Sequence, residues 1–118
     1  MATTTMHFTT TGNEGFEPSV LITEEDKTAS LSKNLFTVPS PAGTTRTGVW
    51  HAEPGTYRHP GGGNETFVVL EGTAEFEMPT GTFHLEPGVV CHIPANVPTV
   101  MVVTSTLRKV SVIVSASA

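Results

Sequence analysis

Beyond residue 45 the chain alternates between short runs of strand-forming residues and clusters of turn-forming residues. The runs are rich in valine, threonine and aromatic residues, and cover residues 46–53, 65–71, 73–78, 82–86, 89–93, 99–104 and 107–115. Proline, glycine and asparagine mark the turns, at Glu53-Pro-Gly55, Pro60 to Asn64, Glu71-Gly72, Pro79-Thr-Gly81, Glu86-Pro-Gly88 and Pro94-Ala-Asn96. Several short strands at this spacing predict an all-β barrel or sandwich.

Hydrophobic alternation within these runs predicts which faces are buried. Ala74, Phe76 and Met78 share one face of their run and two glutamates occupy the other. In the next run His84 opposes two apolar residues, so we expect it to be solvated. Residues 66–70 are instead apolar on both faces. We expect that strand to be covered on both sides, by the barrel interior and by a second sheet or subunit.

The first forty residues carry a weaker pattern. Residues 1 to about 20 are threonine-rich without a clear period, which predicts an arm, and Thr23-Glu-Glu-Asp26 could cap one turn of helix. Residues 35–38 form a short strand-like run before a loop rich in proline and glycine. The expected organisation is an N-terminal arm with an edge strand, residues 1–40, and a single barrel domain, residues 41–118.

Composition narrows the function classes. The 118 residues include six basic and eleven acidic side chains, a formal net charge of -5, and the basic ones are scattered, so no nucleic-acid binding is expected. No apolar run reaches the length of about 18 residues that would predict a membrane span. The N-terminus lacks a signal-peptide pattern, and the single Cys91 fits a reducing compartment. We expect a soluble, cytoplasmic protein that needs no metal merely to fold.

Residues 55–72 contain candidate ligand residues together with a pattern that indicates the fold. Residues 55–72 are a glycine-rich loop followed by a strand, with the spacing His59-x-Gly61-x3-Glu65-x6-Gly72. This spacing resembles the first motif of the cupin superfamily, in which two histidines and a glutamate hold a divalent metal inside a small β-barrel. Gly61 stands where one of the two histidines is expected.

A second stretch supports the same resemblance. Residues 88–99 are similar to the second cupin motif, with Asn96 at a usual glycine position and Thr99 at the position of the last histidine ligand. Asparagine tolerates the left-handed backbone that glycine supplies, so we expect the turn to persist. The flanks at residues 48–55 and 108–110 resemble the subfamily related to ureidoglycine aminohydrolases (cupin_3). The resemblance implies a cupin β-barrel, a double-stranded β-helix or jelly roll of about eight strands, and a homodimer.

The resemblance also implies a set of metal ligands. Its ligand positions fall at His59, Gly61, Glu65 and Thr99, of which only His59 and Glu65 are strong ligands. His92, on the strand that enters the second motif, is a candidate third ligand or general base. The alternative is a packed histidine in the core or at a subunit interface, because both faces of its run are apolar.

Other residues of the two motifs are candidates for binding a substrate. Tyr57 and Arg58 flank His59 and could rim the barrel mouth, where Arg58 would pair with a carboxylate; an ordinary surface salt bridge is the alternative. Four apolar residues share strand parity with Glu65 or Thr99 and are expected in the interior, namely Phe67, Val69, Met101 and Val103.

Two functions remain open at this point. In the first, His59, Glu65 and Thr99, with His92 or waters, hold Mn, Fe, Ni or Zn, and the enzyme performs hydrolase, lyase or isomerase chemistry on a small organic acid or amide. In the second, the barrel is metal-free, and either binds a small molecule or acts as an isomerase or cyclase with Glu65 and His59 as an acid–base pair.

Overall fold

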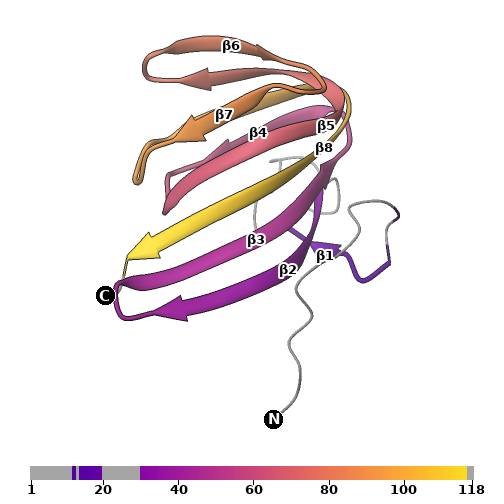
Figure 1. Cartoon of the computed structure of the whole chain (residues 1–118). Coiled ribbons are helices and arrows are strands. Elements are labelled where there is room, and N and C mark those ends of the chain that lie inside the picture. Colours follow the sequence, from indigo (N-terminus) through magenta and orange to yellow (C-terminus); the bar gives the residue numbers. More distant parts are fainter. Residues whose placement is uncertain (1–11, 13, 20–29, 117–118) are drawn as a thin grey trace.

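The computed structural model describes residues 12, 14–19 and 30–116, and every regular element within them is a β-strand (Figure 1). The strands are β1 (Glu17–Pro18), β2 (Ser30–Ser40), β3 (Gly43–Ala52), β4 (Gly55–His59), β5 (Asn64–Met78), β6 (Gly81–Leu85), β7 (Val90–Ile93) and β8 (Thr99–Ala116). The prediction of an all-β fold is confirmed. Within the described residues no helix has the length and hydropathy needed to cross a membrane.

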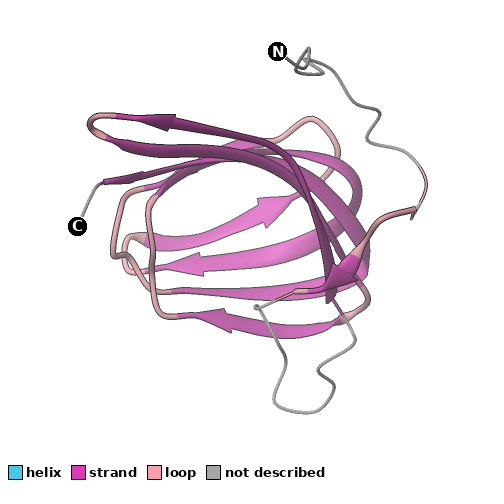
Figure 2. Ribbon diagram, turned by 90° about the horizontal axis from the view of Figure 1, so that it is seen from below, coloured by secondary structure: helices cyan, strands magenta, loops and turns pink. Residues whose placement is uncertain are grey.

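Two long strands, β5 and β8, form the centre of the sheet. They pair antiparallel with each other along most of their length. β3 and then β4 pair with the other edge of β8, while β7 and then β6 pair with the other edge of β5. β2 and β1 extend the sheet beyond β3. The curved strands wrap around one interior, which gives a barrel (Figure 2).

β5 continues through the turn that the sequence predicts at Glu71-Gly72, so that prediction was wrong. Its pairing with β8 shifts register several times between Val69 and Ala74, and such bulges bend a strand without ending it. Gly72 has a φ of 85°, and a Cβ atom there would collide with the carbonyl oxygen of Thr106. Glycine therefore permits the close approach of the two backbones at the bend. β8 similarly joins the predicted runs 99–104 and 107–115.

Two other stretches are more regular than the sequence pattern suggests. Residues 55–59, predicted as loop, form β4 because their backbone pairs with the first residues of β8. β2 extends well beyond the predicted residues 35–38, because it pairs with β3 over nearly its whole length. The predicted helical turn at residues 23–26 lies outside the described residues.

Aromatic side chains pack edge to face in the core. The ring centres of Phe67 and Phe76 are 5.6 Å apart, and those of Trp50 and Tyr57 are 5.1 Å apart. Phe76 is 1% exposed while the glutamates on either side of it are exposed, which confirms the predicted alternation. His84 is exposed, as expected.

In the second half of β8 the polar residues face the interior, although the hydrophobic pattern predicts that the valines do. Valines alternate there with Lys109 and Ser111, and such a pattern ordinarily turns the valines inward. Instead Lys109 and Ser111 are only 4% and 7% exposed. They face the interior because their partners on β3 are Trp50 and Gly48. The barrel therefore contains polar groups that need partners.

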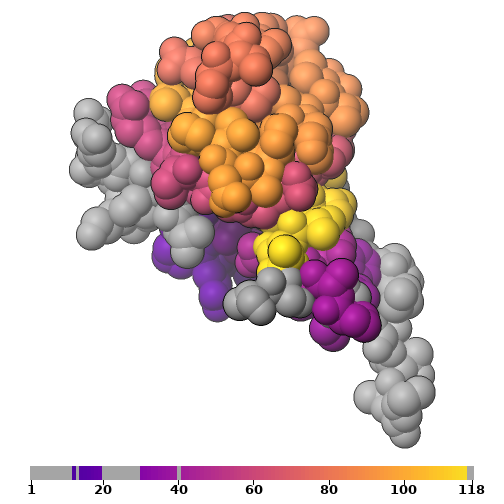
Figure 3. Space-filling model, turned by 90° about the vertical axis from the view of Figure 1, so that its left-hand side faces the viewer, coloured from indigo at the N-terminus to yellow at the C-terminus, as the bar shows by residue number. Residues whose placement is uncertain are grey.

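Four valines that point outward form an apolar surface, here called the outer valine face: Val38, Val90, Val112 and Val114. They are 40–67% exposed. Thr45 lies between Val38 and Val114 in the sheet, and Thr66 lies between Val112 and the exposed His92. In the space-filling view the end of β8, in yellow, reaches the surface between the magenta residues of the β2–β3 hairpin and the orange residues that precede β8 (Figure 3).

Candidate functional site

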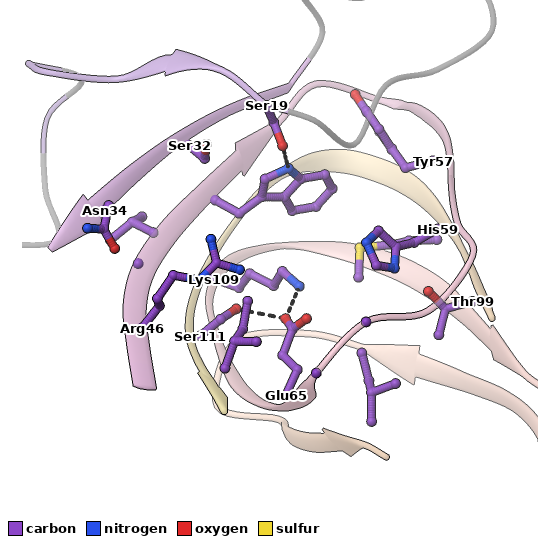
Figure 4. A pocket seen from close by; sticks show the side chains of 18 of the residues that line it. Ser19, Ser32, Asn34, Arg46, Tyr57, His59, Glu65, Thr99, Lys109 and Ser111 are labelled. Atoms are coloured by element: carbon purple, nitrogen blue, oxygen red, sulfur yellow. Dashed lines mark hydrogen bonds and ion pairs between the residues drawn. The ribbon is translucent and has the colours of Figure 1, made fainter. Parts of the chain in front are cut away.

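A cavity of about 260 Å³ lies inside the barrel (Figure 4). Its polar lining comes from three groups of residues: Glu65, Lys109 and Ser111; His59 and Thr99; and Ser19, Ser32, Lys33, Asn34 and Arg46. A closed cavity of about 150 Å³ already holds benzene. The space is therefore sufficient for a small organic molecule larger than a single ring.

Glu65 and Lys109 form an ion pair in the middle of this lining, here called the buried ion pair. Lys109 Nζ donates to Glu65 Oε2 at 2.7 Å, and Ser111 Oγ donates to the same oxygen at 2.9 Å. The Lys109 side chain is 5% exposed, and its Nζ lies 4.3 Å from the ring centre of Phe67 and 5.3 Å from that of Trp50. The carboxylate and both aromatic rings stabilise the ammonium group.

Opposing effects set the ionisation of Glu65. Burial raises its pKa, but the charge of Lys109, the hydrogen bonds from Lys109 and Ser111, and the interaction with His59 outweigh burial and hold the pKa below its ordinary value. Glu65 is therefore ionised at neutral pH. The buried ion pair has no net charge, and Glu65 Oε1 has no hydrogen-bond partner among the described residues.

His59 and Thr99 lie directly opposite each other on β4 and β8. The backbone N–H of Gly61 donates to His59 Nδ1 at 3.1 Å, so in the neutral ring the proton is on Nε2. Thr99 is 9% exposed. Within the described part of the chain neither His59 Nε2 nor the Thr99 hydroxyl has a hydrogen-bond partner. Both groups are left for a molecule in the cavity.

The glycine-rich loop is fixed against the turn at Asn96. Asn96 has a φ of 63°, which confirms the predicted left-handed residue, and its N–H donates to the Gly62 carbonyl at 2.8 Å. Ala95 N–H donates to Asn64 Oδ1 at 3.0 Å. Gly61 has a φ of 116°, and a Cβ atom there would lie 2.7 Å from the carbonyl carbon of Asn96. A histidine at position 61 does not fit unless this backbone moves.

β2 and β3 supply the opposite side of the cavity. Figure 4 shows Arg46 and Asn34 on one side of the buried ion pair, and His59 and Thr99 on the other. Asn34 Nδ2 donates to Thr37 Oγ1 at 2.7 Å. Arg46, by contrast, makes no ion pair or hydrogen bond with any residue that the structure describes. A cationic side chain without a counterion thus borders the cavity.

The predicted site residues separate into two groups. Five line the cavity: Tyr57, His59, Glu65, Thr99 and Met101. The Tyr57 hydroxyl already donates to the Glu53 carbonyl, at 2.6 Å. Phe67 and Val69 are each 1% exposed and belong to the packed core, where they do not border the cavity. Arg58 is exposed on the outer side of β4, because it alternates with residues that face inward. These three are not placed to contact a ligand.

His92 also lies on the outside of the barrel. Its Nδ1 is 2.9 Å from Oγ1 of Thr66, its exposed neighbour on β5, while the next residue, Ile93, faces the cavity. The sequence left the facing of His92 open, and the structure turns it away from Glu65 and His59. The prediction of His92 as a third ligand or catalytic base is corrected, because its ring does not reach the interior.

Four site residues were not predicted from the sequence: Lys109, Ser111, Arg46 and Trp50. Lys109 and Ser111 alternate with valines, a pattern that ordinarily turns the polar residues outward. Strand parity could have predicted their burial, because Lys109 and Ser111 lie on the same face of β8 as Leu107, which is fully buried. Arg46 likewise shares the parity of Trp50 on β3.

This donor set does not suit a divalent metal ion. In the described residues no group of three His, Cys, Asp or Glu side chains is close enough to hold one. Gly61 offers no side chain, Thr99 offers a neutral hydroxyl, and the Glu65 carboxylate already binds an ammonium group. A divalent ion beside Glu65 would experience the repulsion of Lys109 at short range.

Residues 39–110 match the sequence model of a family described as the EutQ-like cupin domain. A search of curated protein sequences finds no match.

Solved structures share the fold at low sequence identity. The EutQ protein of Clostridium difficile is 21% identical with a TM-score of 0.63, over 75% of this chain and 64% of that one. A putative ethanolamine utilization protein q of Salmonella typhimurium is 18% identical with a TM-score of 0.62, over 75% and 71%. A cupin superfamily protein of Desulfitobacterium hafniense is 16% identical with a TM-score of 0.60, over 73% and 77%. This chain therefore spans less than two thirds of the C. difficile protein, and these similarities establish the barrel alone.

Proposed function

The chain belongs to the EutQ-like cupin family, and from this premise we propose that it is a metal-independent cupin that binds a small organic molecule in its cavity. The motifs at residues 55–72 and 88–99 predicted this membership, and the family match confirms it. Cupins of one fold have many activities, so the proposal rests on the site rather than on the fold.

The buried ion pair is the observation that carries the proposal. The family resemblance puts a metal between the positions of His59, Gly61, Glu65 and Thr99. In this chain the ammonium group of Lys109 lies 2.7 Å from Glu65 and supplies a positive charge there. We infer that Lys109 takes over the electrostatic role of the ion, because one buried carboxylate needs one cation.

The open groups of the cavity support binding of a carbonyl or carboxyl compound. His59 Nε2–H and the Thr99 hydroxyl can donate hydrogen bonds, and Glu65 Oε1 can accept one. An isomerase or cyclase with Glu65 and His59 as its acid–base pair would require a raised pKa at Glu65, whereas Lys109 and Ser111 lower it. Binding is therefore the function that we propose.

Elemental analysis of protein purified without a histidine tag tests the metal-independent proposal. Wild type is compared with a His59→Ala, Glu65→Ala double variant and with His84→Ala, in which an exposed histidine on β6 is removed as a control. We expect less than stoichiometric transition metal in all three. Stoichiometric metal in wild type and in His84→Ala, but not in the double variant, would refute the proposal.

Small-molecule binding has an internal reporter. Trp50 is the single tryptophan of the chain, is 5% exposed and lines the cavity. A ligand in the cavity should therefore change the tryptophan fluorescence, and a molecule that binds elsewhere should not.

A further inference from the structure

Arg46 is an exposed residue that borders the cavity and has no counterion among the described residues. It lies opposite Ile113 of β8, on the inward side of β3, in a chain whose formal net charge is -5. Glu65 lies in the same row, on the other side of Ile113. Its carboxylate is held by Lys109 and Ser111 instead. Arg46 therefore has no internal carboxylate with which to pair among the residues described.

Two other cations lie at the cavity, Lys109 and Lys33. Lys109 is neutralised by Glu65. Lys33 borders the cavity opposite Val49, and the end of its side chain lies against Gly15. Since the buried ion pair is neutral and the end of the Lys33 side chain lies beside Gly15, which does not line the cavity, Arg46 is the guanidinium available to a ligand among the described lining residues.

We infer that the ligand is a small monocarboxylic acid with an apolar body of about ring size, and that Arg46 binds its carboxylate; this rests on the proposed function. A guanidinium group matches the geometry of a carboxylate with two parallel hydrogen bonds. The apolar body then lies near Trp50 and Met101, and its far end reaches His59 and Thr99. Arg46 and these two residues occupy opposite sides of the buried ion pair (Figure 4).

Without a positive charge free of an internal carboxylate, the cavity would not distinguish an acid from its amide. The role expected for Arg58 from the sequence thus passes to Arg46, twelve positions earlier and on the inner side of the sheet.

The test uses benzoate and benzamide, which have nearly the same size and differ in charge. Calorimetric titration measures their affinity, and Trp50 fluorescence reports whether they enter the cavity. The proteins are wild type, Arg46→Gln, Arg46→Lys and, as the matched control, Arg58→Gln. All four are treated with a chelator, and thermal melting confirms that each is folded.

We expect wild type to bind benzoate about tenfold or more tightly than benzamide, as one charge-assisted hydrogen-bonded pair predicts. Arg46→Gln should abolish this preference by weakening benzoate alone, Arg46→Lys should keep part of it, and Arg58→Gln should leave it unchanged. Equal affinities in wild type, a preference that survives in Arg46→Gln, or binding of neither probe would overturn the inference. Elemental analysis of the samples before chelation would reveal a metal-dependent protein. Failure of the metal-independent proposal can therefore be distinguished from failure of the role inferred for Arg46.

Discussion

Replacing Lys109 by methionine removes the ammonium group while it keeps most of the side-chain volume. The Glu65 side chain, which is 19% exposed, then loses its cation and one of its two hydrogen bonds. Breaking a buried ion pair by removal of one partner costs about 3–5 kcal/mol. Because Glu65 retains some exposure and the bond from Ser111, we expect the free energy of unfolding at neutral pH to fall by about 3 kcal/mol.

The destabilisation should depend on pH with a defined sign. In wild type the folded-state pKa of Glu65 lies below the ordinary value of 4.5, so its stabilising contribution is present above that value and is lost as the pH falls through the folded-state pKa. In Lys109→Met only the hydrogen bond from Ser111 and the interaction with His59 still oppose burial, so the pKa of Glu65 rises relative to wild type. As the pH falls, protonation of Glu65 removes the unpaired buried charge from the variant and so reduces its loss of stability. The difference in stability between the two proteins should shrink from neutral pH to about pH 4.

Urea denaturation across this pH range measures both effects. Lys33→Met is the matched control, since it removes the same group from a partly exposed site and should change stability by about 0.5 kcal/mol or less. In Lys109→Met, Glu65→Leu no charge remains unpaired, so this variant should be more stable than Lys109→Met alone. A loss in Lys109→Met no larger than in the control, or one that does not vary with pH, would refute the role given to the buried ion pair.

Three further outcomes are expected. The hydrogen bond that His84 Nδ1 donates to Glu75 Oε1, at 2.6 Å, is the main cause that raises the pKa of His84. NMR titration should therefore show a lower pKa in Glu75→Gln and little change in Glu77→Gln, and equal shifts would contradict the assignment. Gly61→Ala should lower the melting temperature more than Gly88→Ala, since both residues have positive φ but only Gly61 would bring a Cβ against backbone atoms; similar losses would mean that this contact relaxes freely. We propose a homodimer through the outer valine face, so light scattering should show a dimer at micromolar concentration that Val112→Lys separates and Phe83→Lys, on β6, does not; a monomeric wild type would exclude it.

The barrel could be predicted because its evidence is local. Turn residues such as Pro94 and Asn96, and the alternation around Phe76, depend on neighbours in sequence. The same local evidence failed at Glu71-Gly72, where pairing with β8 keeps the strand continuous. It also failed at β4, whose residues pair with residues of β8 that lie 40 to 48 positions later in the chain.

The candidate site could be predicted only where it follows a motif. His59, Glu65 and Thr99 were found by the spacing of the two cupin motifs, and the structure brings all three to the cavity. Lys109 could not be found in this way, because a lysine beside valines on a strand normally faces water. Its burial is determined by pairing with Trp50 and by a carboxylate 44 positions earlier in the chain. Such long-range compensation leaves no pattern in the neighbouring residues.

The central place of β8 has a consequence for how the chain folds during synthesis. β3, β4 and β5 all pair with β8, yet β8 spans residues 99–116 and is made after them. The earlier strands therefore leave the ribosome with the backbone groups of one edge unpaired, until β8 has been synthesised. Contacts that join distant parts of a chain form slowly. Lys109 arrives on that same strand, so until then the carboxylate of Glu65 has no cation, and the sheet and its binding site are completed together.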